Sequence, residues 1–292
     1  FEPMPEGFVH AEYNNIESVK ALVNEKTVAI LLEAVQGEGG IIAGDEQFIK
    51  DVRALCDEKD LLMLCDEVQC GLGRTGEWFG FQAYDVEPDA FSLAKALGSG
   101  YPIGAVVSGP KLADVFQPGN HASTFGGTPL ACAAALATLD VMDAEGLVDR
   151  SKEKGALFAE GLEAFVEKYE HVTGVRGRGL MLGLVLDQDA KPLTTALAEI
   201  GLLTIATAGN IVRFLPPLTV KDDELEEALD ILDDCLDAMH GGAETVEEAV
   251  EEAPAEEAPA ADEAPAAEPA AEDEAPADGV DEDAAEEEGT PA

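Results

Sequence analysis

Basic residues are scarce in this sequence. The 292 residues contain 17 lysines and arginines against 61 aspartates and glutamates, which gives a formal net charge of −44. Between Glu244 and Ala292 there are 20 acids and no base, which leaves a charge of −24 on the residues before them. Because both parts of the chain repel phosphate groups, this charge argues against nucleic acid and against an anionic membrane surface as partners.

Paired cysteines, zinc-site spacings and membrane-spanning runs are also absent. The five cysteines are an odd number in no CxxC or CxxH spacing, which predicts reduced thiols in a cytosolic protein rather than disulfides or a zinc site. No stretch is long and apolar enough to cross a bilayer. The first residues, FEPMPEGFVHAEYNN, have no basic segment before an apolar core and do not begin with Met. We therefore expect no signal peptide, a cytoplasmic localisation and a chain that begins partway through a longer one.

Short apolar runs alternate with helical patterns in the first half of the chain. Runs at Val28–Leu32, Leu61–Cys65 and Ala90–Leu93 predict buried strands, and Ile103–Ser108 predicts a further strand. Asp45 is placed to cap a helix between the first two strands. A strand, a helix and a strand in this order form a right-handed crossover, so the sequence predicts an α/β fold with a mostly parallel sheet. An apolar fraction of 46% is ample for its core.

The pattern changes in the C-terminal part, where strand pairs and helices predict a compact α+β lobe. We place the boundary between the parallel-sheet domain, 1–145, and this lobe, 146–242, after residue 145. The predicted elements are helices at Leu130–Asp143, Asp149–Lys168 and Asp222–Met239 and strands at Val172–Val175, Leu180–Leu186, Leu202–Ile205 and Ile211–Phe214.

Residues 243–292 consist mainly of Ala, Glu, Asp and Pro in loose EEAPA-like repeats without an aromatic residue. Such a segment buries too little apolar surface to offset the entropy that it loses on ordering. We expect a disordered acidic tail that acts as a solvating segment or a spacer, rather than a catalytic or metal-binding segment.

Charged side chains follow two of the predicted strands. Asp66 and Glu67 come directly after Leu61–Cys65, and Lys95 follows Ala90–Leu93 after one residue. Ligands of open α/β sheets bind beyond the carboxyl ends of the strands, so an acid and a lysine at these positions face one ligand. Pyridoxal phosphate requires such a pair, because a lysine holds its aldehyde as a Schiff base and a carboxylate keeps its pyridine nitrogen protonated. Taken singly, the acids are also compatible with an ordinary turn, and Lys95 with an ordinary surface position.

Arg213 is a second unusual charge, because it lies within an apolar strand pattern. A buried arginine normally needs an acid partner or a bound carboxylate. Glu38 is the candidate acid, and a plain structural ion pair is the alternative to a substrate site.

Three further features are candidates for a site, and each has a simpler interpretation. His121 is one of four histidines, but it lies among turn residues without an obvious partner, so we favour a structural role over acid–base chemistry. The loop at 121–129 is rich in hydroxyls and glycine and opens a helix, which suits an anion, although capping and turning is the simpler interpretation. The run from Gly71 to Arg74 lacks the spacing and the following helix of a phosphate loop.

Six longer motifs extend this picture over the chain up to about His240. They are EAVQGEGG at 33–40, DEVQCGLGRTG at 66–76, PDAFSLAKALGSGYPIGAVV at 88–107, HASTFGGTPLAC at 121–132, VRGRGLMLGL at 175–184 and VRFLPPL at 212–218. In these motifs the chain resembles the class III (ornithine/acetylornithine type) aminotransferases, which are fold-type I pyridoxal phosphate enzymes. Within the family the resemblance is strongest to enzymes that act on N-acetylornithine, chiefly through TFGGTPLACAAALA and AGNIVRFLPPLTV.

The resemblance implies a cofactor site for pyridoxal 5'-phosphate. Lys95 is then the catalytic lysine that carries the cofactor and moves protons, and burial beside a cationic cofactor would lower its pKa. Asp66 is then the partner of the pyridine nitrogen. The other implied cofactor-binding residues are Val68 on the ring, Gln69 at the ring hydroxyl, and Ser123 and Thr124 at the phosphate across a dimer interface.

The resemblance also implies a substrate site and a reaction. Arg213 would bind the α-carboxylate of glutamate or 2-oxoglutarate, Glu38 would mask it when the other amino substrate is bound, and Glu33 would support the site. The implied reaction is ping-pong transfer of an amino group between N-acetylornithine and 2-oxoglutarate in arginine biosynthesis, by a homodimer. The alternatives are an ornithine or 4-aminobutyrate aminotransferase, or a non-catalytic truncated module that keeps the fold for pairing.

The chain departs from the family in its first part. The family begins well upstream of FEPMPEGF, with a Ser-Gly-Thr phosphate loop, an aromatic residue that stacks on the ring and a substrate-carboxylate arginine. Ala34 also replaces the usual proline after Glu33. We therefore expect a sheet with an exposed edge, a cofactor with one open face and a fragment or truncated gene product with little activity alone.

Overall fold

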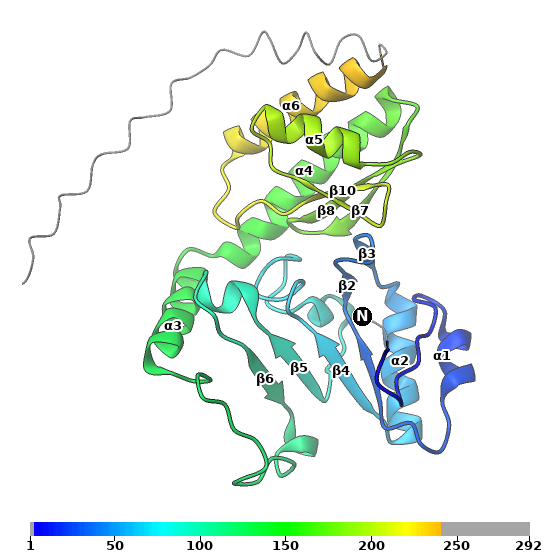
Figure 1. The fold of residues 1–292 in the computed structure, drawn as a ribbon, viewed down its shortest axis with the longest axis vertical. Coiled ribbons are helices and arrows are strands. Elements are labelled where there is room, and N and C mark those ends of the chain that lie inside the picture. The colour runs from blue at the N-terminus through cyan, green and yellow to red at the C-terminus, as the bar shows by residue number, and fades with distance from the viewer. Residues whose placement is uncertain (1–2, 241–292) are drawn as a thin grey trace, which may run out of the picture. The chain divides into compact units, whose positions relative to one another are not determined.

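Two four-stranded sheets organise residues 3–240, the part of the chain that this computed structural model describes (Figure 1). The described strands are β1 (Ala29–Leu32), β2 (Val35–Gln36), β3 (Ile42–Ala43), β4 (Leu62–Asp66), β5 (Ala90–Leu93), β6 (Ala105–Ser108), β7 (Val172–Arg178), β8 (Met181–Leu186), β9 (Ile205–Thr207) and β10 (Ile211–Phe214). The described α-helices are α1 (Ile16–Leu22), α2 (Glu46–Lys59), α3 (Pro129–Ala144), α4 (Leu147–Lys168), α5 (Lys191–Glu199) and α6 (Asp222–His240). Short 3₁₀ helices form at η1 (Gly80–Tyr84), η2 (Lys95–Gly98) and η3 (Pro110–Leu112).

The first sheet has the strand order β1-β4-β5-β6 and is mostly parallel, as predicted. β1 and β4 are parallel, with α2 as the crossover between them, and β4 and β5 are also parallel. β6 runs antiparallel to β5. The carboxyl ends of β4 and β5 therefore lie beside the beginning of β6, and the chain that follows β6 leaves from the opposite end of the sheet.

One face of the first sheet packs on α2. Phe48, Ile49 and Val52 of this amphipathic helix are buried in one cluster with Met63 and Cys65 of β4. Because successive side chains of a strand point to opposite faces, the residues between and after these two project from the other face. This alternation determines where the acid at the end of β4 points.

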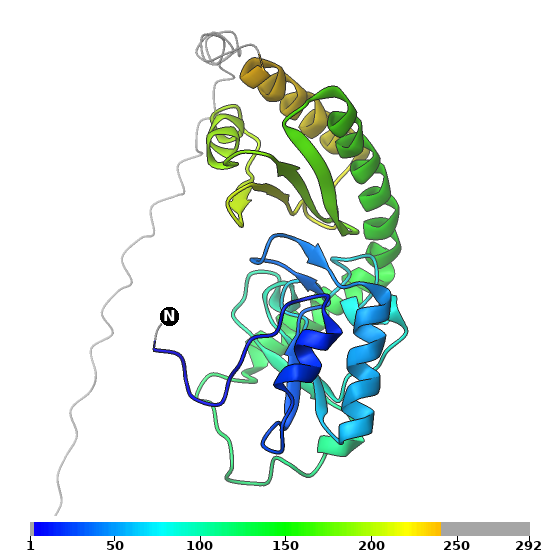
Figure 2. The same ribbon diagram turned by 90° about the vertical axis from the view of Figure 1, so that its right-hand side faces the viewer.

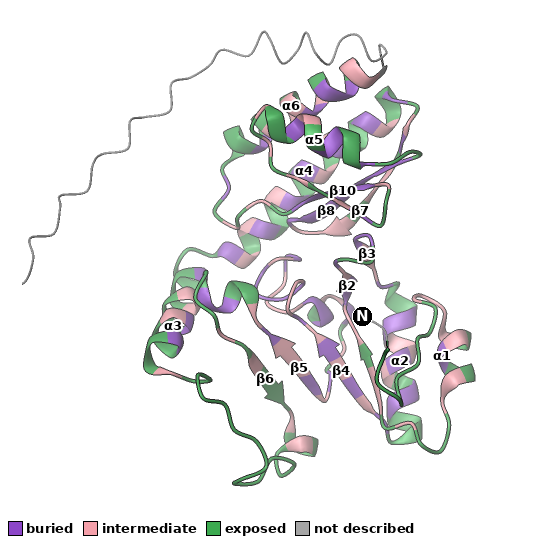
Figure 3. Cartoon of the chain, in the orientation of Figure 1, coloured by how far each residue is buried: buried purple, intermediate pink, exposed green. Residues whose placement is uncertain are grey.

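Both edge strands of the first sheet contain exposed residues (Figure 3). Leu31 of β1 is 63% exposed and Val106 of β6 is 69% exposed. The prediction of a buried strand at Val28–Leu32 was therefore wrong. An edge strand has one neighbouring strand among the described residues, and only part of its surface is covered.

The second sheet has the order β7-β8-β10-β9 and is antiparallel throughout. All six residues of β8 are buried, and α4, α5 and α6 share one large apolar cluster with the sheet. α6 packs against both α4 and α5 (Figure 2). This half of the chain has the predicted α+β character. The described residues belong to one compact unit, so the division at residue 145 stays a prediction, and the predicted tail at 243–292 lies outside the described residues.

A third apolar cluster contains the one tryptophan of the sequence. Trp78 is half-buried against it, and its buried members are Leu72, Leu93, Leu97, Ala135, Met142 and Leu147. The cluster thus joins β5 and η2 to α3 and α4. No helix among residues 3–240 has the length and apolar character needed to cross a membrane.

Candidate active site

Asp66 ends β4 and projects from the sheet face opposite α2. One of its carboxylate oxygens, Oδ1, accepts hydrogen bonds from the Val68 backbone N–H at 3.0 Å and from the Ser92 hydroxyl at 3.2 Å. Ser92 is its partner in the β4–β5 ladder, so both side chains stand on one face. The Asp66 carboxylate is thus held in place by two donors and only half-buried, which leaves its other oxygen for a ligand.

Glu67 points the other way and is 1% exposed. Its two carboxylate oxygens accept the backbone N–H groups of Gly80 at 2.7 Å and Phe81 at 3.1 Å, which begin η1. Burial raises the pKa of this carboxyl to about 7, against the opposing effect of those hydrogen bonds. The two neighbouring acids therefore differ in role, because Asp66 faces the open side and Glu67 anchors the loop that follows it.

Lys95 begins η2, two residues after the end of β5. Its φ of 42° lies in the left-handed region, which is uncommon for a residue with a side chain and often marks a functional position. The side chain is exposed within the described residues, and the expected burial of Lys95 beside a bound cofactor stays a prediction. The sequence around it is apolar, but Leu93 and Leu97 pack below the turn that carries Lys95 outward.

Four charged side chains interact at the carboxyl ends of β1, β4 and β5. The pKa of Glu33 is raised mainly by burial and further by the charges of Asp66 and Glu38, whereas the charge of Lys95 lowers it. The Glu33 carboxylate also accepts the Gly37 N–H at 3.2 Å. The structure therefore brings the predicted Glu33, Glu38, Asp66 and Lys95 into one electrostatic group.

Arg213 reaches this group from β10 of the second sheet. It is 8% exposed, and its Nη1 donates to the Glu38 carboxylate at 2.7 Å. Gln69 donates to the same carboxylate oxygen at 3.3 Å, and the two hydrogen bonds lower the pKa of Glu38. The predicted pairing of Arg213 with Glu38 is confirmed. The buried Arg213 Nε has no partner among the described residues, so the guanidinium has a donor to spare.

Ser123 and Thr124 stand apart from these residues. Both are exposed, and the Ser123 hydroxyl accepts the Gly126 N–H at 2.9 Å within its own turn. The loop that carries them follows antiparallel β6, and within residues 3–240 no hydrogen bond joins it to Asp66 or Lys95. Their implied role at a phosphate stays a prediction.

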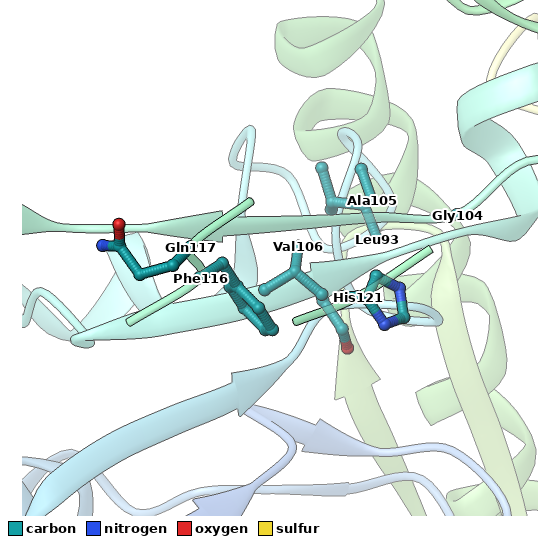
Figure 4. A pocket seen from close by; sticks show the side chains of 8 residues that line it. Leu93, Gly104, Ala105, Val106, Phe116, Gln117 and His121 are labelled. Atoms are coloured by element: carbon teal, nitrogen blue, oxygen red, sulfur yellow. The ribbon is translucent and has the colours of Figure 1, made fainter. Parts of the chain in front are cut away.

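A pocket of about 590 Å³ opens beside Ser92, the hydrogen-bond partner of Asp66 (Figure 4). His121 lines it next to Phe116, with the two ring centroids 5.9 Å apart. The lining residues are Ser92, Leu93, Gly104, Ala105, Val106, Phe116, Gln117 and His121. His121 thus lines the pocket with an exposed side chain, and its structural role stays a prediction. No cluster of side chains in the described part of the chain has the composition of a metal site.

Arg74 is a residue that sequence reasoning missed. Its Nη1 donates to the backbone carbonyls of Leu180 at 3.0 Å and Pro216 at 2.5 Å, and burial lowers its pKa to about 10. The one available signal was a charged residue inside a Gly-rich loop that is otherwise small or apolar.

Comparison with known proteins adds the family. The protein-family model described as "Aminotransferase class-III" matches residues 3–236. The chain belongs to this family. A protein named "Acetylornithine aminotransferase" from Gloeobacter violaceus is 49% identical over 235 residues, which are 80% of this chain and 58% of that protein. A protein of the same name from Methanocaldococcus jannaschii is 45% identical over 80% of this chain and 59% of its own length. The class III chain therefore spans less than two thirds of these relatives.

Solved structures agree with the fold. The crystal structure of acetylornithine aminotransferase from Elizabethkingia anophelis matches with a TM-score of 0.75 and 38% identity, over 80% of this chain and 63% of that one. The ornithine aminotransferase from Toxoplasma gondii matches with a TM-score of 0.78 and 34% identity, over 82% of this chain and 58% of that one. This class III chain has the fold-type I architecture of pyridoxal phosphate transferases, and the family depends on that cofactor.

The described residues fit pyridoxal phosphate. A carboxylate (Asp66), an amide (Gln69) and an amine (Lys95) follow neighbouring parallel strands, which is the donor set that the cofactor's ring and aldehyde require. Asp66, Gln69 and Lys95 do not line the pocket beside Ser92, so the fit rests on these side chains and not on that pocket. The unpartnered Nε of Arg213 matches the need of a carboxylate substrate for a second donor.

Proposed function

We propose that this chain binds pyridoxal 5'-phosphate and transfers an amino group between N-acetylornithine and 2-oxoglutarate, a reaction of arginine biosynthesis in the cytoplasm. The observation that carries the proposal is the placement of Asp66 and Lys95 at the carboxyl ends of parallel β4 and β5 in a class III chain. The names of the relatives support N-acetylornithine as the amino donor.

Four residues of the chain would have separate roles at the cofactor. When bound, pyridoxal phosphate supplies an electron sink for the negative charge that develops at the substrate Cα. Asp66 would keep the ring nitrogen protonated, and its hydrogen bonds from Val68 N–H and Ser92 hold the carboxylate for this purpose. Lys95 Nζ would hold the cofactor between turnovers and take and return the Cα proton. Val68 would pack on the ring and Gln69 would bind the ring hydroxyl.

Arg213 would bind the α-carboxylate of glutamate or 2-oxoglutarate. Its present partner, Glu38, is 73% exposed in its side chain, so the Glu38 carboxylate would move into solvent when a substrate carboxylate takes its place on the buried Arg213. Glu38 would return to Arg213 when the other amino substrate occupies the site. Glu33, whose pKa is raised mainly by burial, would support the site beside Lys95.

Ser123 and Thr124 would bind the cofactor phosphate of a second copy of the chain in a homodimer. Their exposure and the direction of β6 support a role outside their own site.

The test is titration of the purified chain with pyridoxal phosphate, followed by visible absorption. We expect the band of a lysine-bound cofactor, and after borohydride reduction the label should map to the peptide that contains Lys95. Lys95→Ala should abolish both, whereas Lys59→Ala, an exposed lysine on α2, should change neither. Absence of the band at saturating cofactor would contradict the proposal and favour the non-catalytic module.

The absorption band of the lysine-bound cofactor also identifies the amino donor. We expect N-acetylornithine to bleach it faster than ornithine or 4-aminobutyrate, and 2-oxoglutarate to restore it. Ornithine is the second candidate, because the chain also matches the Toxoplasma gondii ornithine aminotransferase structure. Faster bleaching by ornithine would replace the proposed substrate and keep the reaction class.

A further inference from the structure

Residues 71–77, the junction loop, connect the first sheet to the second at a place apart from Glu38. The Arg74 carbonyl accepts the Leu180 N–H at 3.0 Å and the Ser151 hydroxyl at 3.2 Å. Gly179, with a φ of 53°, comes so close that a Cβ there would lie 2.5 Å from the carbonyl carbon of Thr75. This backbone-to-backbone approach leaves the junction loop little freedom to move against the β7–β8 turn.

The Arg74 side chain completes the end of the second sheet. The last pair between β8 and β10 joins Leu182 to Phe214, so two residues farther along this register stand Leu180 and Pro216. Pro216 has no N–H and cannot continue the ladder. Arg74 Nη1 instead donates to both carbonyls and ties the two chain segments together.

Arg74 has no carboxylate partner among the ion pairs of residues 3–240. A buried guanidinium without an acid is costly unless neutral acceptors satisfy it. Its attachment to two backbone carbonyls therefore requires that the loop and the strand end stay together. Since the acceptors are neutral, the binding of a charged substrate gives them no reason to separate.

Two connections thus join Arg213 to the cofactor side of the molecule. The first is its ion pair with Glu38, which joins the buried Arg213 to an exposed carboxylate and has to break when Arg213 takes a substrate carboxylate. The second runs from Pro216, three residues after Arg213, through Arg74 to the loop that follows Asp66. The second is independent of what occupies Arg213, as is the hydrogen bond that the Thr207 hydroxyl of neighbouring β9 donates to the Glu38 backbone carbonyl at 2.8 Å.

We propose that Arg74 is a positioning residue that holds the end of β10, and with it Arg213, at a fixed place relative to Asp66 after Glu38 has released Arg213. The proposal rests on the proposed function in one respect, the binding of a substrate carboxylate by Arg213. Arg74 itself touches neither substrate nor cofactor.

The experiment measures binding of 2-oxoglutarate to the cofactor-loaded chain by calorimetry. Arg74→Met should raise the Kd of 2-oxoglutarate by about tenfold, the size expected when hydrogen bonds from a charged group are lost. The cofactor band and the Kd of pyridoxal phosphate should stay as in the unchanged chain, and Arg74→Lys should recover part of the affinity. Lys152→Met, which removes the exposed ion pair with Glu77 at the same junction, is the matched control and should leave the Kd unchanged.

A second measurement uses the cofactor-free chain. Arg74→Met should accelerate amide hydrogen exchange in residues 211–215 and leave exchange in residues 62–66 unchanged, which general destabilisation of the chain would not do. If Arg74→Met does not fold, the Kd of 2-oxoglutarate and the hydrogen exchange are measured on Arg74→Lys instead.

Three outcomes overturn the proposal: an unchanged Kd for 2-oxoglutarate, a parallel loss of cofactor and 2-oxoglutarate binding, or exchange in residues 211–215 that does not change. The absence of a cofactor band in the unchanged chain overturns the proposed function instead, and the exchange measurement then still decides the role of Arg74.

Discussion

The two sheets differ in how fully their side chains are covered. Every residue of β8, a central strand of the second sheet, is buried beneath α4, α5 and α6. In the first sheet, β1 and β6 expose apolar side chains, and Asp66 and Lys95 lie at its open end. The central strand of the second sheet is therefore fully covered, whereas the first sheet carries the candidate chemistry at an open end. Arg213 is the exception, because it belongs to the second sheet but pairs with Glu38 beside the open end of the first.

The largest test of this difference is a pair of truncations. Leu184→Ala, at a fully buried position of β8, should lower the free energy of unfolding by about 2–5 kcal/mol, because the lost methyl groups leave a cavity. Val106→Ala, on exposed β6, should change it by less than about 0.5 kcal/mol. Denaturant unfolding of both variants measures the two values. Similar losses would mean that β6 is covered in solution.

The pH dependence of the free energy of unfolding tests the burial of Glu67 at the end of the first sheet. Its pKa is raised from 4.5 to about 7, so between these values the folded chain keeps a proton that the unfolded chain has lost. The free energy of unfolding should therefore fall as pH rises through this window, by about 3 kcal/mol at about 1.4 kcal/mol per pKa unit. Above pH 7 this contribution should be constant.

The measurement is denaturant unfolding at several pH values for the unchanged chain and for Glu67→Gln. The difference in stability between the two should change across the window and level off above it, because glutamine does not titrate. A difference that is independent of pH would show that Glu67 is ionised throughout and that its two N–H donors outweigh burial.

The smallest effect is expected where Arg213 of the second sheet meets the exposed Glu38. Glu38→Gln should change the free energy of unfolding by less than about 1 kcal/mol, because the Glu38 side chain is 73% exposed and glutamine keeps an oxygen that accepts the hydrogen bond from the buried Arg213. Thermal or denaturant unfolding at low and high salt checks this value. A larger loss would make the Glu38–Arg213 pair structural and count against its release by substrate.

Local sequence patterns predicted the fold where the spacing of the apolar residues matches the side chains that the structure buries. The bounds of β5, Ala90–Leu93, were predicted as the structure has them, because a short apolar run between turn residues has few alternatives. The pairing of Arg213 with Glu38 was also predictable, since a charge in an apolar strand needs a partner. The strand expected at Leu202–Ile205 instead spans Ile205–Thr207, where pairing with β10 decides the bounds.

Long-range coverage was not predictable in the same way. The exposure of β1 and of Lys95 depends on which segments lie over them, and the sequence of the strand or turn itself does not contain this information. The acceptors of Arg74 lie 106 and 142 residues away in the chain, so no local motif indicates them. The direction of β6, which separates Ser123 and Thr124 from Asp66, likewise follows from pairing with β5 rather than from composition.

Trp78 gives the molecule a native optical probe. As the one indole in 292 residues, it accounts for all tryptophan emission, so no label and no second tryptophan complicates the signal. Its cluster joins Leu97, next to the lysine turn, to Met142 and Leu147, which adjoin the junction loop. Emission that shifts to the red reports water entering that cluster, and unchanged emission during a titration reports that the cluster stays dry.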